Sequence, residues 1–203
     1  MIGSMMMNSK RNLLGLLGAT AMTSVLAASN RPQRAAPAGP RAGYFPNSIV
    51  HTHDGRALRF YDDVVKGKIV AFNMMYTSCT GICPNNTANL MRVQEALAEH
   101  LGKEVFMYSL TLRPEVDSAQ ALRDYVDRYA IPKGWTFLTG RPAENDVIRR
   151  KLGFYNDDPA IDADIQQHTG MVRIGNEALD RWAMCPALGS PKQIARAIMH
   201  LRA

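Results

Sequence analysis

Two cysteines, Cys79 and Cys83, have the residue type and spacing best suited to chemistry in this 203-residue chain. An apolar run from Ile69 to Phe72 precedes them, and Pro84 follows directly. The run predicts a buried strand, and proline is favoured at the first helical position because its missing N–H is not needed there. Both sulfurs are therefore expected where a strand leads into a helix N-terminus. Partial positive charge and unpaired N–H groups at that terminus favour thiolate, so at least one of these thiols should have a lowered pKa.

A thiolate pair with this spacing can attack sulfur, bind a soft metal or form a structural disulfide. Residues four apart on a helical turn have Cβ atoms about 5–6 Å apart, which permits both a disulfide and a shared metal ion. A purely structural disulfide would stabilise the folded protein only slightly, because the loop that it closes is short. We therefore favour a functional pair. The third cysteine, Cys185, is expected to be a buried inert thiol, with disulfide exchange or a link to another chain as the alternatives.

The chain divides into three parts. Residues 1–28 are expected to be a signal peptide or membrane anchor, because Lys10 and Arg11 precede an apolar segment. Residues 29–43 are rich in Pro, Ala, Arg and Gly and predict a flexible linker. Residues 44–203 are expected to form one domain. The leader predicts an exported protein, located in the periplasm and either soluble or tethered to the inner membrane.

The net charge of +6 arises mostly outside the domain. Of the 24 basic residues, five precede residue 44, so 19 basic residues face 18 acidic ones in the domain. A basic face for nucleic acid is therefore not supported. A membrane surface would be contacted only through the leader or the linker arginines, and solvating a flexible segment is the favoured role for those arginines.

The order of elements predicts an α/β fold. The expected strands are Ile49–Thr52, Arg56–Phe60, Ile69–Met74, Glu104–Leu110, Trp135–Leu138, Met171–Ile174 and Leu179–Ala183, and the expected helices include Pro84–Leu101, Pro142–Leu152 and one opening at Ser190. A β-α-β unit with a cysteine pair at its first turn, followed by a hairpin and a helix, predicts a thioredoxin-like central mixed sheet. Helices should cover both faces, and an N-terminal β-hairpin should flank the sheet.

His168 is the candidate third ligand. It lies immediately before the Met171 strand, in the loop that faces the cysteine helix N-terminus in a thioredoxin-like sheet. Two thiolates and one imidazole form a soft site suited to Cu(I) and tolerable for Cu(II). A structural zinc site would require a fourth ligand, which the sequence does not supply. The alternative for a lone loop histidine is a solvated side chain.

These residues resemble the Sco/SenC family. The resemblance is carried by Lys66-Gly67-Lys68, by Tyr76-Thr77-Ser78-Cys79-x-x-x-Cys83-Pro84 and by His168, and it extends from Phe45 to Leu201. Membership would imply a thioredoxin-like copper-binding chaperone with Cys79, Cys83 and His168 as the metal ligands. It would also imply delivery of copper to the dinuclear copper centre of cytochrome c oxidase, or reduction of its cysteines. The expected partner is the copper-bearing subunit of that oxidase or another copper carrier.

The chain departs from the family pattern at two positions near the expected site. Family members usually have Asp-Pro-Glu after the second core strand, whereas this chain has Arg113-Pro114-Glu115 after Leu112. Many also have an aspartate beside the histidine, where this chain has Gln167. Fewer nearby carboxylates mean less negative charge to stabilise a cation. We therefore expect an altered affinity for Cu(II), or a different partner.

Two alternatives to a metallochaperone remain open, and both are enzymes. A thiol–disulfide oxidoreductase would use Cys79 to attack a disulfide and Cys83 to resolve the mixed disulfide, with His168 tuning a thiol pKa. A peroxidase is the third hypothesis, because Thr77-x-Cys79 distantly resembles a peroxidatic loop, but the rest of that pattern is missing. The metallochaperone, which is not an enzyme, is the leading hypothesis.

Overall fold

The computed structural model describes residues 38–202. The predicted leader, residues 1–28, and the first part of the predicted linker lie outside the described residues. The last linker residues contact the domain: the main-chain N–H of Arg41 donates to Glu177 Oε1 at 3.2 Å, and its guanidinium pairs with Asp180. A domain boundary at residue 44 stays a prediction.

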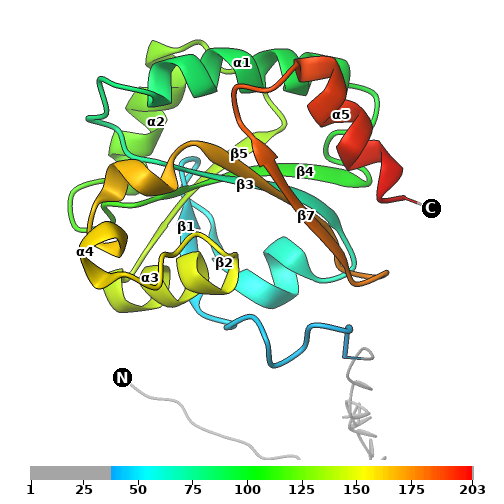
Figure 1. The fold of residues 1–203 in the computed structure, drawn as a ribbon, viewed down its shortest axis with the longest axis horizontal. Helices are drawn as coiled ribbons and strands as arrows, with labels where there is room; N and C mark the ends of the chain where they lie inside the picture. Colours follow the sequence, from blue (N-terminus) through cyan, green and yellow to red (C-terminus); the bar gives the residue numbers. More distant parts are fainter. Residues whose placement is uncertain (1–37, 203) are drawn as a thin grey trace, which may run out of the picture. The chain divides into compact units, whose positions relative to one another are not determined.

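A mixed β-sheet of seven strands organises residues 38–202, in the order β2-β1-β5-β4-β3-β6-β7. The strands are β1 Ile49–Thr52, β2 Ala57–Arg59, β3 Ile69–Met75, β4 Val105–Thr111, β5 Trp135–Gly140, β6 Met171–Asn176 and β7 Arg181–Pro186. The central strands β3, β4 and β5 are parallel, and β6 runs antiparallel to β3. The predicted thioredoxin-like mixed sheet with its N-terminal β1–β2 hairpin is confirmed (Figure 1).

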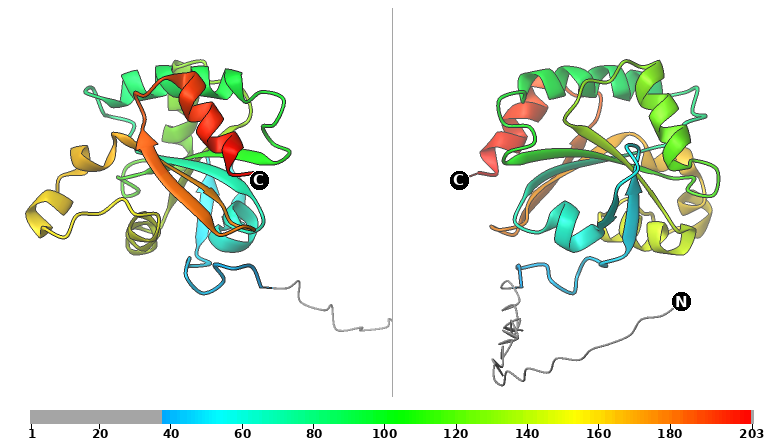
Figure 2. Two further views of the ribbon diagram at one scale, coloured as in Figure 1. Left: turned by 45° about the vertical axis from the view of Figure 1, so that its right-hand side comes forward. Right: turned by 180° about the vertical axis from the view of Figure 1, so that it is seen from behind.

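Helices cover both faces of this sheet (Figures 1 and 2). One face carries α1 Cys83–Ala96, α2 Ala119–Arg128 and α5 Pro191–His200; the other carries a π-helix, Phe60–Val65, and α3 Pro142–Lys151. Two short elements, α4 Pro159–Asp162 and a 3-10 helix Ile165–His168, connect α3 to β6. Within residues 38–202, none of the helices has the length and apolar character needed to cross a bilayer.

Several element boundaries differ from the sequence-based expectation. Helix α1 ends at Ala96 rather than Leu101; residues 97–100 form turns, and Leu101 forms an isolated β-bridge with Val105. Strand β7 begins at Arg181, two residues later than predicted. The acidic segment between α3 and β6 contains α4, because the Asp158 side chain accepts from the N–H of Ala160 and Pro159 starts the helix.

Each face of the sheet has its own hydrophobic core. The core beneath α1, α2 and α5 includes Leu90, Leu122, Tyr125 and Phe137, and the core beneath the π-helix and α3 includes Phe60, Phe72, Leu138 and Ile148. Both Cys79 and Cys83 belong to the first core. The cysteine pair is therefore supported by packed side chains rather than by a free loop.

Candidate functional site: a thiol pair at the start of α1

The cysteine pair lies where the sequence predicts, between a buried strand and a helix. Strand β3 is buried along its whole length and ends at Met75. A turn follows, in which the N–H of Cys79 donates to the carbonyl of Tyr76 at 3.1 Å. Helix α1 then begins at Cys83, with Pro84 in its first turn. Both cysteines are free thiols in this structure.

Hydrogen bonds lower the pKa of the Cys79 thiol. Burial by itself would raise it, but the Cys83 thiol, the N–H of Cys83, the Tyr76 hydroxyl and the N–H of Gly81 all donate to the Cys79 sulfur and outweigh burial. The N–H of Cys83 is available because Cys83 is the first residue of α1, where the main-chain N–H has no intrahelical acceptor. The lowered pKa expected at this helix N-terminus therefore belongs to Cys79.

Cys83 behaves in the opposite way. Burial raises its pKa to about 12, and donating its hydrogen to Cys79 contributes in the same direction. Its exposed fraction is 2%, against 7% for Cys79. Ionisation of the pair is thus easier at Cys79, the more accessible residue, than at Cys83 behind it.

Tyr76 is a site residue that the sequence did not single out. Burial raises its pKa to about 12, and the hydrogen bond that its hydroxyl donates to Cys79 adds to this effect. A protonated tyrosine is a stable donor to a thiolate across the physiological pH range. Tyr76 belongs to the motif that carries the family resemblance, but nothing in the pattern indicated that its hydroxyl would contact sulfur.

A buried carboxylate fastens the start of the cysteine loop. Asp117, which is 1% exposed, accepts hydrogen bonds from the N–H and the hydroxyl of Thr77 and from the hydroxyl of Thr111. Thr77 begins the cysteine loop and Thr111 ends β4. Asp117 therefore fixes the loop to the end of the neighbouring parallel strand.

The structure places the main chain of the His168 loop against α1. The side-chain amide of Asn86, in the first turns of α1, donates to the carbonyl of Thr169, which follows His168. The imidazole itself is buried and contacts other groups: its Nε2 lies 3.0 Å from the carbonyl oxygen of Asp162 and 3.3 Å from Nη1 of Arg149. The loop is near the cysteine helix, but its imidazole is engaged elsewhere.

The three predicted ligands do not form one cluster in this structure. Over residues 38–202, no group of three or more His, Cys, Asp or Glu side chains is arranged to hold a metal ion. The two cysteines are brought together, whereas His168 is held by Arg149 and Asp162. A ligand set of Cys79, Cys83 and His168 therefore stays a prediction.

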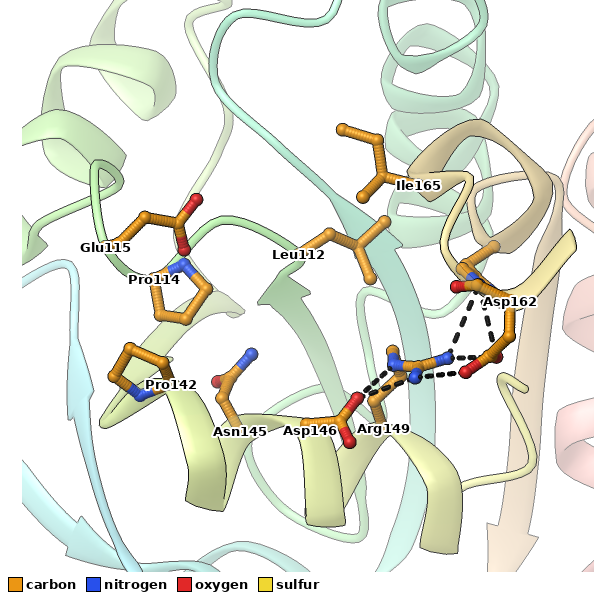
Figure 3. A pocket seen from close by; sticks show the side chains of 10 residues that line it. Leu112, Pro114, Glu115, Pro142, Asn145, Asp146, Arg149, Asp162 and Ile165 are labelled. Atoms are coloured by element: carbon orange, nitrogen blue, oxygen red, sulfur yellow. Dashed lines mark hydrogen bonds and ion pairs between the residues drawn. The ribbon is translucent and has the colours of Figure 1, made fainter. Parts of the chain in front are cut away.

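Arg149 and Asp162 were also missed by sequence reasoning. Arg149 begins a basic run at the end of α3, which is typical of exposed charges near a helix C-terminus. Its side chain is nevertheless only 9% exposed, and that of Asp162 only 7%. Figure 3 shows Arg149 between Asp146 and Asp162, beside a cavity of about 240 Å³ that His168 also lines. The available signal was helical spacing, since Arg149 lies four residues after Asn145 and three before Leu152, which are both buried.

Cys185 is separate from the hydrogen-bonded pair. It lies on β7 opposite Val172 of β6, is half-buried, and packs at the margin of the first core. Burial raises the pKa of its thiol. Because a protonated thiol is a poor nucleophile, this environment favours the inert role expected from the sequence.

Comparisons with known proteins agree with the fold and with the family that the sequence resembles. The chain is 32% identical over 78 residues to the SCO1 protein homolog of Bacillus subtilis (strain 168). That match covers 37% of this chain and 39% of the relative, so the chain spans about two-fifths of the relative's length.

Two solved structures share the fold. The copper-bound ScoI of Bradyrhizobium japonicum is similar with a TM-score of 0.60 and 18% identity, over 77% of this chain and 99% of that one. The second is BsSco, which is described as having a disulfide switch and as a member of the Sco family of cytochrome c oxidase assembly proteins. It is similar with a TM-score of 0.61 and 19% identity, over 77% of this chain and 93% of that one. The SCO1/SenC family model matches residues 50–202, nearly all of the described residues. The chain therefore belongs to the SCO1/SenC family.

Proposed function

We propose that this protein is a copper carrier that binds one copper ion through Cys79, Cys83 and His168 and passes it on during assembly of cytochrome c oxidase. The observation that carries the proposal is the hydrogen-bonded Cys79–Cys83 pair at the start of α1. Support also comes from the relatives, since ScoI of Bradyrhizobium japonicum was solved with copper bound and BsSco belongs to a family of oxidase assembly proteins.

The thiol pair fits a soft cation. The pKa of Cys79 is already lowered, and the hydrogen that Cys83 donates to it can be replaced by a metal ion shared between the two sulfurs. Binding then releases the Cys83 proton, because a metal-bound thiol is deprotonated. Sulfur ligands select Cu(I) over hard cations.

His168 would complete the ligand set. A neutral imidazole adds no charge, so two thiolates and one imidazole hold Cu(I) with a total charge of about −1. A copper ion held by only three ligands is suited to transfer. An incoming ligand from the recipient protein can bind the ion before a ligand of this protein leaves it. The proposed recipient is the copper-bearing subunit of the oxidase or another copper-carrier protein.

We further propose that the protein works outside the cytoplasm, in the periplasm or at the outer surface of the inner membrane. The support is the predicted leader in residues 1–28, where Lys10 and Arg11 precede an apolar segment.

Competition with a Cu(I) chelator under reducing, anaerobic conditions tests the copper proposal. Wild-type protein should take up one Cu(I) per chain, and a Cys79→Ser/Cys83→Ser double variant should take up none. Cys185→Ser is the matched control and should bind as wild type does, because Cys185 lies outside the pair. A double variant that competes as well as wild type would refute the proposal.

A second function is favoured by the asymmetry of the two thiol pKa values. One thiol with a lowered pKa in front of one with a raised pKa is the arrangement of a thiol–disulfide oxidoreductase. The Cys79 thiolate would attack a partner disulfide and release one partner thiolate. Cys83 would lose its proton, attack the Cys79 sulfur and release the second partner thiolate. The partner gains two electrons, and the Cys79–Cys83 disulfide forms.

The variant His168→Ala separates the two functions. A copper carrier should lose most of its Cu(I) affinity, because one of three ligands is removed. Reduction of a model disulfide should continue, because both sulfurs and the donors to Cys79 remain. A variant that loses disulfide reduction and keeps wild-type copper affinity would reverse the ranking of the two functions.

A further inference from the structure

A cavity of about 520 Å³ lies at the end of the parallel strands away from the cysteine pair. Its walls include residues near the starts of these strands: Lys68 before β3, Phe106 in β4 and Trp135 in β5. The cysteines instead follow the last residue of β3. Because β3, β4 and β5 run in the same direction, the cavity and the thiol pair lie at opposite ends of the sheet. The volume is that of a pocket for a small molecule.

The unpaired charge in this cavity is positive. Its walls carry two carboxylates, and both already have an arginine partner: Asp54 pairs with Arg56, and Asp63 pairs with Arg59. The walls also carry Lys68 and Lys133, and neither lysine pairs with a carboxylate of residues 38–202. The remaining surface is largely apolar, with Leu58, Phe106, Ile131 and Trp135. A ligand for this cavity should therefore combine negative charge with an apolar body.

Lys68 presents donors that the protein does not use. Its half-buried ammonium donates to the main-chain carbonyl of Asp63 and lies 4.6 Å from the centre of the Phe106 ring. Burial lowers its pKa, although the charge of Asp63 acts against this effect. An ammonium has three hydrogens, and this carbonyl uses one of them. A partly desolvated cation with hydrogens to spare is stabilised by an anionic acceptor.

The Tyr108 hydroxyl is a second unused donor. Its ring is only 5% exposed and stacks on Phe72 with centroids 5.2 Å apart, yet the residue lines the cavity. Within the described part of the chain, the hydroxyl has no hydrogen-bond partner, whereas a buried tyrosine hydroxyl usually has one. Burial raises the pKa of Tyr108, so the hydroxyl keeps its hydrogen. It can therefore donate to an acceptor inside the cavity.

His53 supplies a third donor. Its Nδ1 accepts the main-chain N–H of Phe137 at 3.1 Å, so the ring is neutral and its hydrogen is on Nε2. Burial lowers the pKa of His53, which favours this neutral form. No acceptor for Nε2 is found between residues 38 and 202. The charge of Arg56 acts on His53, Lys68 and Tyr108 alike, which places all three donors around one arginine.

We propose that this cavity binds a small organic anion with a flat apolar body, such as an aromatic carboxylate. The Lys68 ammonium and the Tyr108 hydroxyl donate to the anionic group, and the apolar body packs against Phe106 and Trp135. Phe106 and Tyr108 are two residues apart on β4 and so share one face of the strand, which brings the apolar surface and the donors together. The site lies outside the proposed copper-binding residues and adds a second function to the domain.

Three probes test the proposal on the full wild-type chain. 1-Naphthoate has the ring and the carboxylate, 1-naphthylmethylammonium keeps the ring with the opposite charge, and acetate keeps the carboxylate without the ring. In amide nuclear magnetic resonance spectra, 1-naphthoate should give saturable shifts at Phe106, Tyr108 and Trp135, and should bind at least roughly 10-fold more tightly than either other probe. Equal binding of the three probes, or no saturable shifts at these residues, would overturn the proposal.

Two variants test the donors. Tyr108→Phe keeps the stacked ring and removes only the hydroxyl, and Lys68→Met removes the charge from a side chain of similar length. Each should weaken 1-naphthoate binding roughly 3- to 10-fold, the effect of losing about one hydrogen bond. Wild-type affinity in either variant would refute the assigned role of that donor and the proposal with it.

Matched controls remove the same groups outside the cavity. Tyr155→Phe and Lys103→Met are at exposed positions that do not line it, and both should bind 1-naphthoate as wild type does. Losses in the controls equal to those in the cavity variants would attribute binding to general charge and refute the site.

The cysteine variant separates this site from the copper function. Cys79→Ser/Cys83→Ser should bind 1-naphthoate with wild-type affinity, because the cavity lies at the other end of the strands. If 1-naphthoate fails to bind while wild type still takes up Cu(I), the copper function stands and this proposal falls. If the cysteine variant loses 1-naphthoate binding, the probe occupies the thiol site, and the assignment of the cavity is wrong.

Discussion

The main-chain N–H of Thr77 donates a 3.1 Å hydrogen bond to the buried carboxylate of Asp117. The Thr77 hydroxyl binds the other oxygen of the same carboxylate, so one side chain holds the first residue of the cysteine loop at two points. The loop is thereby held rigidly at its start, two residues before the reactive sulfur. Pre-organisation of this kind keeps Cys79 within reach of the N–H groups that stabilise its thiolate.

Asp117→Ala should therefore destabilise the protein and loosen the site. It leaves a buried N–H and two hydroxyls without their charged acceptor, and each hydrogen bond to a charged group contributes roughly 1.5–3 kcal/mol. We expect the free energy of unfolding to fall by at least about 2 kcal/mol, measured by urea denaturation. Asp124→Ala, at an exposed position on α2, should change it by less than about 0.5 kcal/mol. Equal losses would contradict the proposed role of Asp117.

Alkylation of the free protein should label Cys79 first. Its lowered pKa means that thiolate appears at a lower pH than for an ordinary cysteine, whereas the Cys83 thiol stays protonated until the pH approaches 12. Reaction with iodoacetamide near neutral pH, followed by mass spectrometry, should give one modified residue. As the pH falls through the Cys79 pKa, the reaction should slow because thiolate is lost.

Cys185 provides the internal control for this labelling experiment. It is more accessible than either member of the pair, but burial raises the pKa of its thiol. If exposure alone decided reactivity, Cys185 would be modified before Cys79. That result would show that the hydrogen bonds to Cys79 do not control its ionisation.

The local features of the site could be predicted from the sequence. The apolar run before the cysteines and Pro84 after them specify a buried strand and a helix start, and the structure has β3 ending at Met75 and α1 beginning at Cys83. These signals work because each depends on neighbouring residues only. The fold class followed from the order of strands and helices along the chain.

The contacts that decide the chemistry could not be predicted, because they join residues distant in sequence. Asp117 lies 40 positions from Thr77, and Arg149 lies 19 positions from His168. Sequence reasoning placed His168 beside the cysteine helix from the position of its loop. The loop does lie there, but the direction of the imidazole is set by contacts with α3 and α4 that no local pattern encodes.

Tyr76→Phe should raise the pKa of Cys79. The variant keeps the buried ring and removes only the hydroxyl that donates to the sulfur. Loss of one hydrogen bond of about 1 kcal/mol corresponds to roughly fivefold less thiolate at a given pH below the pKa. The ultraviolet absorbance of thiolate, followed as a function of pH, measures this change. Tyr155→Phe, at an exposed position, should leave the titration unchanged; a shift of the same size there would indicate a non-specific effect.

Arg113 places a positive charge beside the cysteine loop. Its Nη1 donates to the Ser78 hydroxyl at 3.3 Å, and Ser78 directly precedes Cys79. The resemblance described from the sequence implies that the family pattern usually has aspartate at this position. A cation here disfavours a bound metal cation and favours thiolate, so the chain should bind Cu(II) less tightly than a relative with aspartate.

Arg113→Asp should therefore strengthen Cu(II) binding. Reversing one nearby charge should raise affinity roughly 3- to 10-fold at low salt, because exposed charges interact by about 1 kcal/mol or less in water. The gain should shrink as salt is added, since screening weakens interactions beyond about 10 Å at 0.1 M ionic strength. Competition with a weak Cu(II) chelator at two salt concentrations measures both effects. Arg128→Asp, at the exposed end of α2, is the charge-matched control, and an equal gain there would attribute the effect to net charge instead of to Arg113.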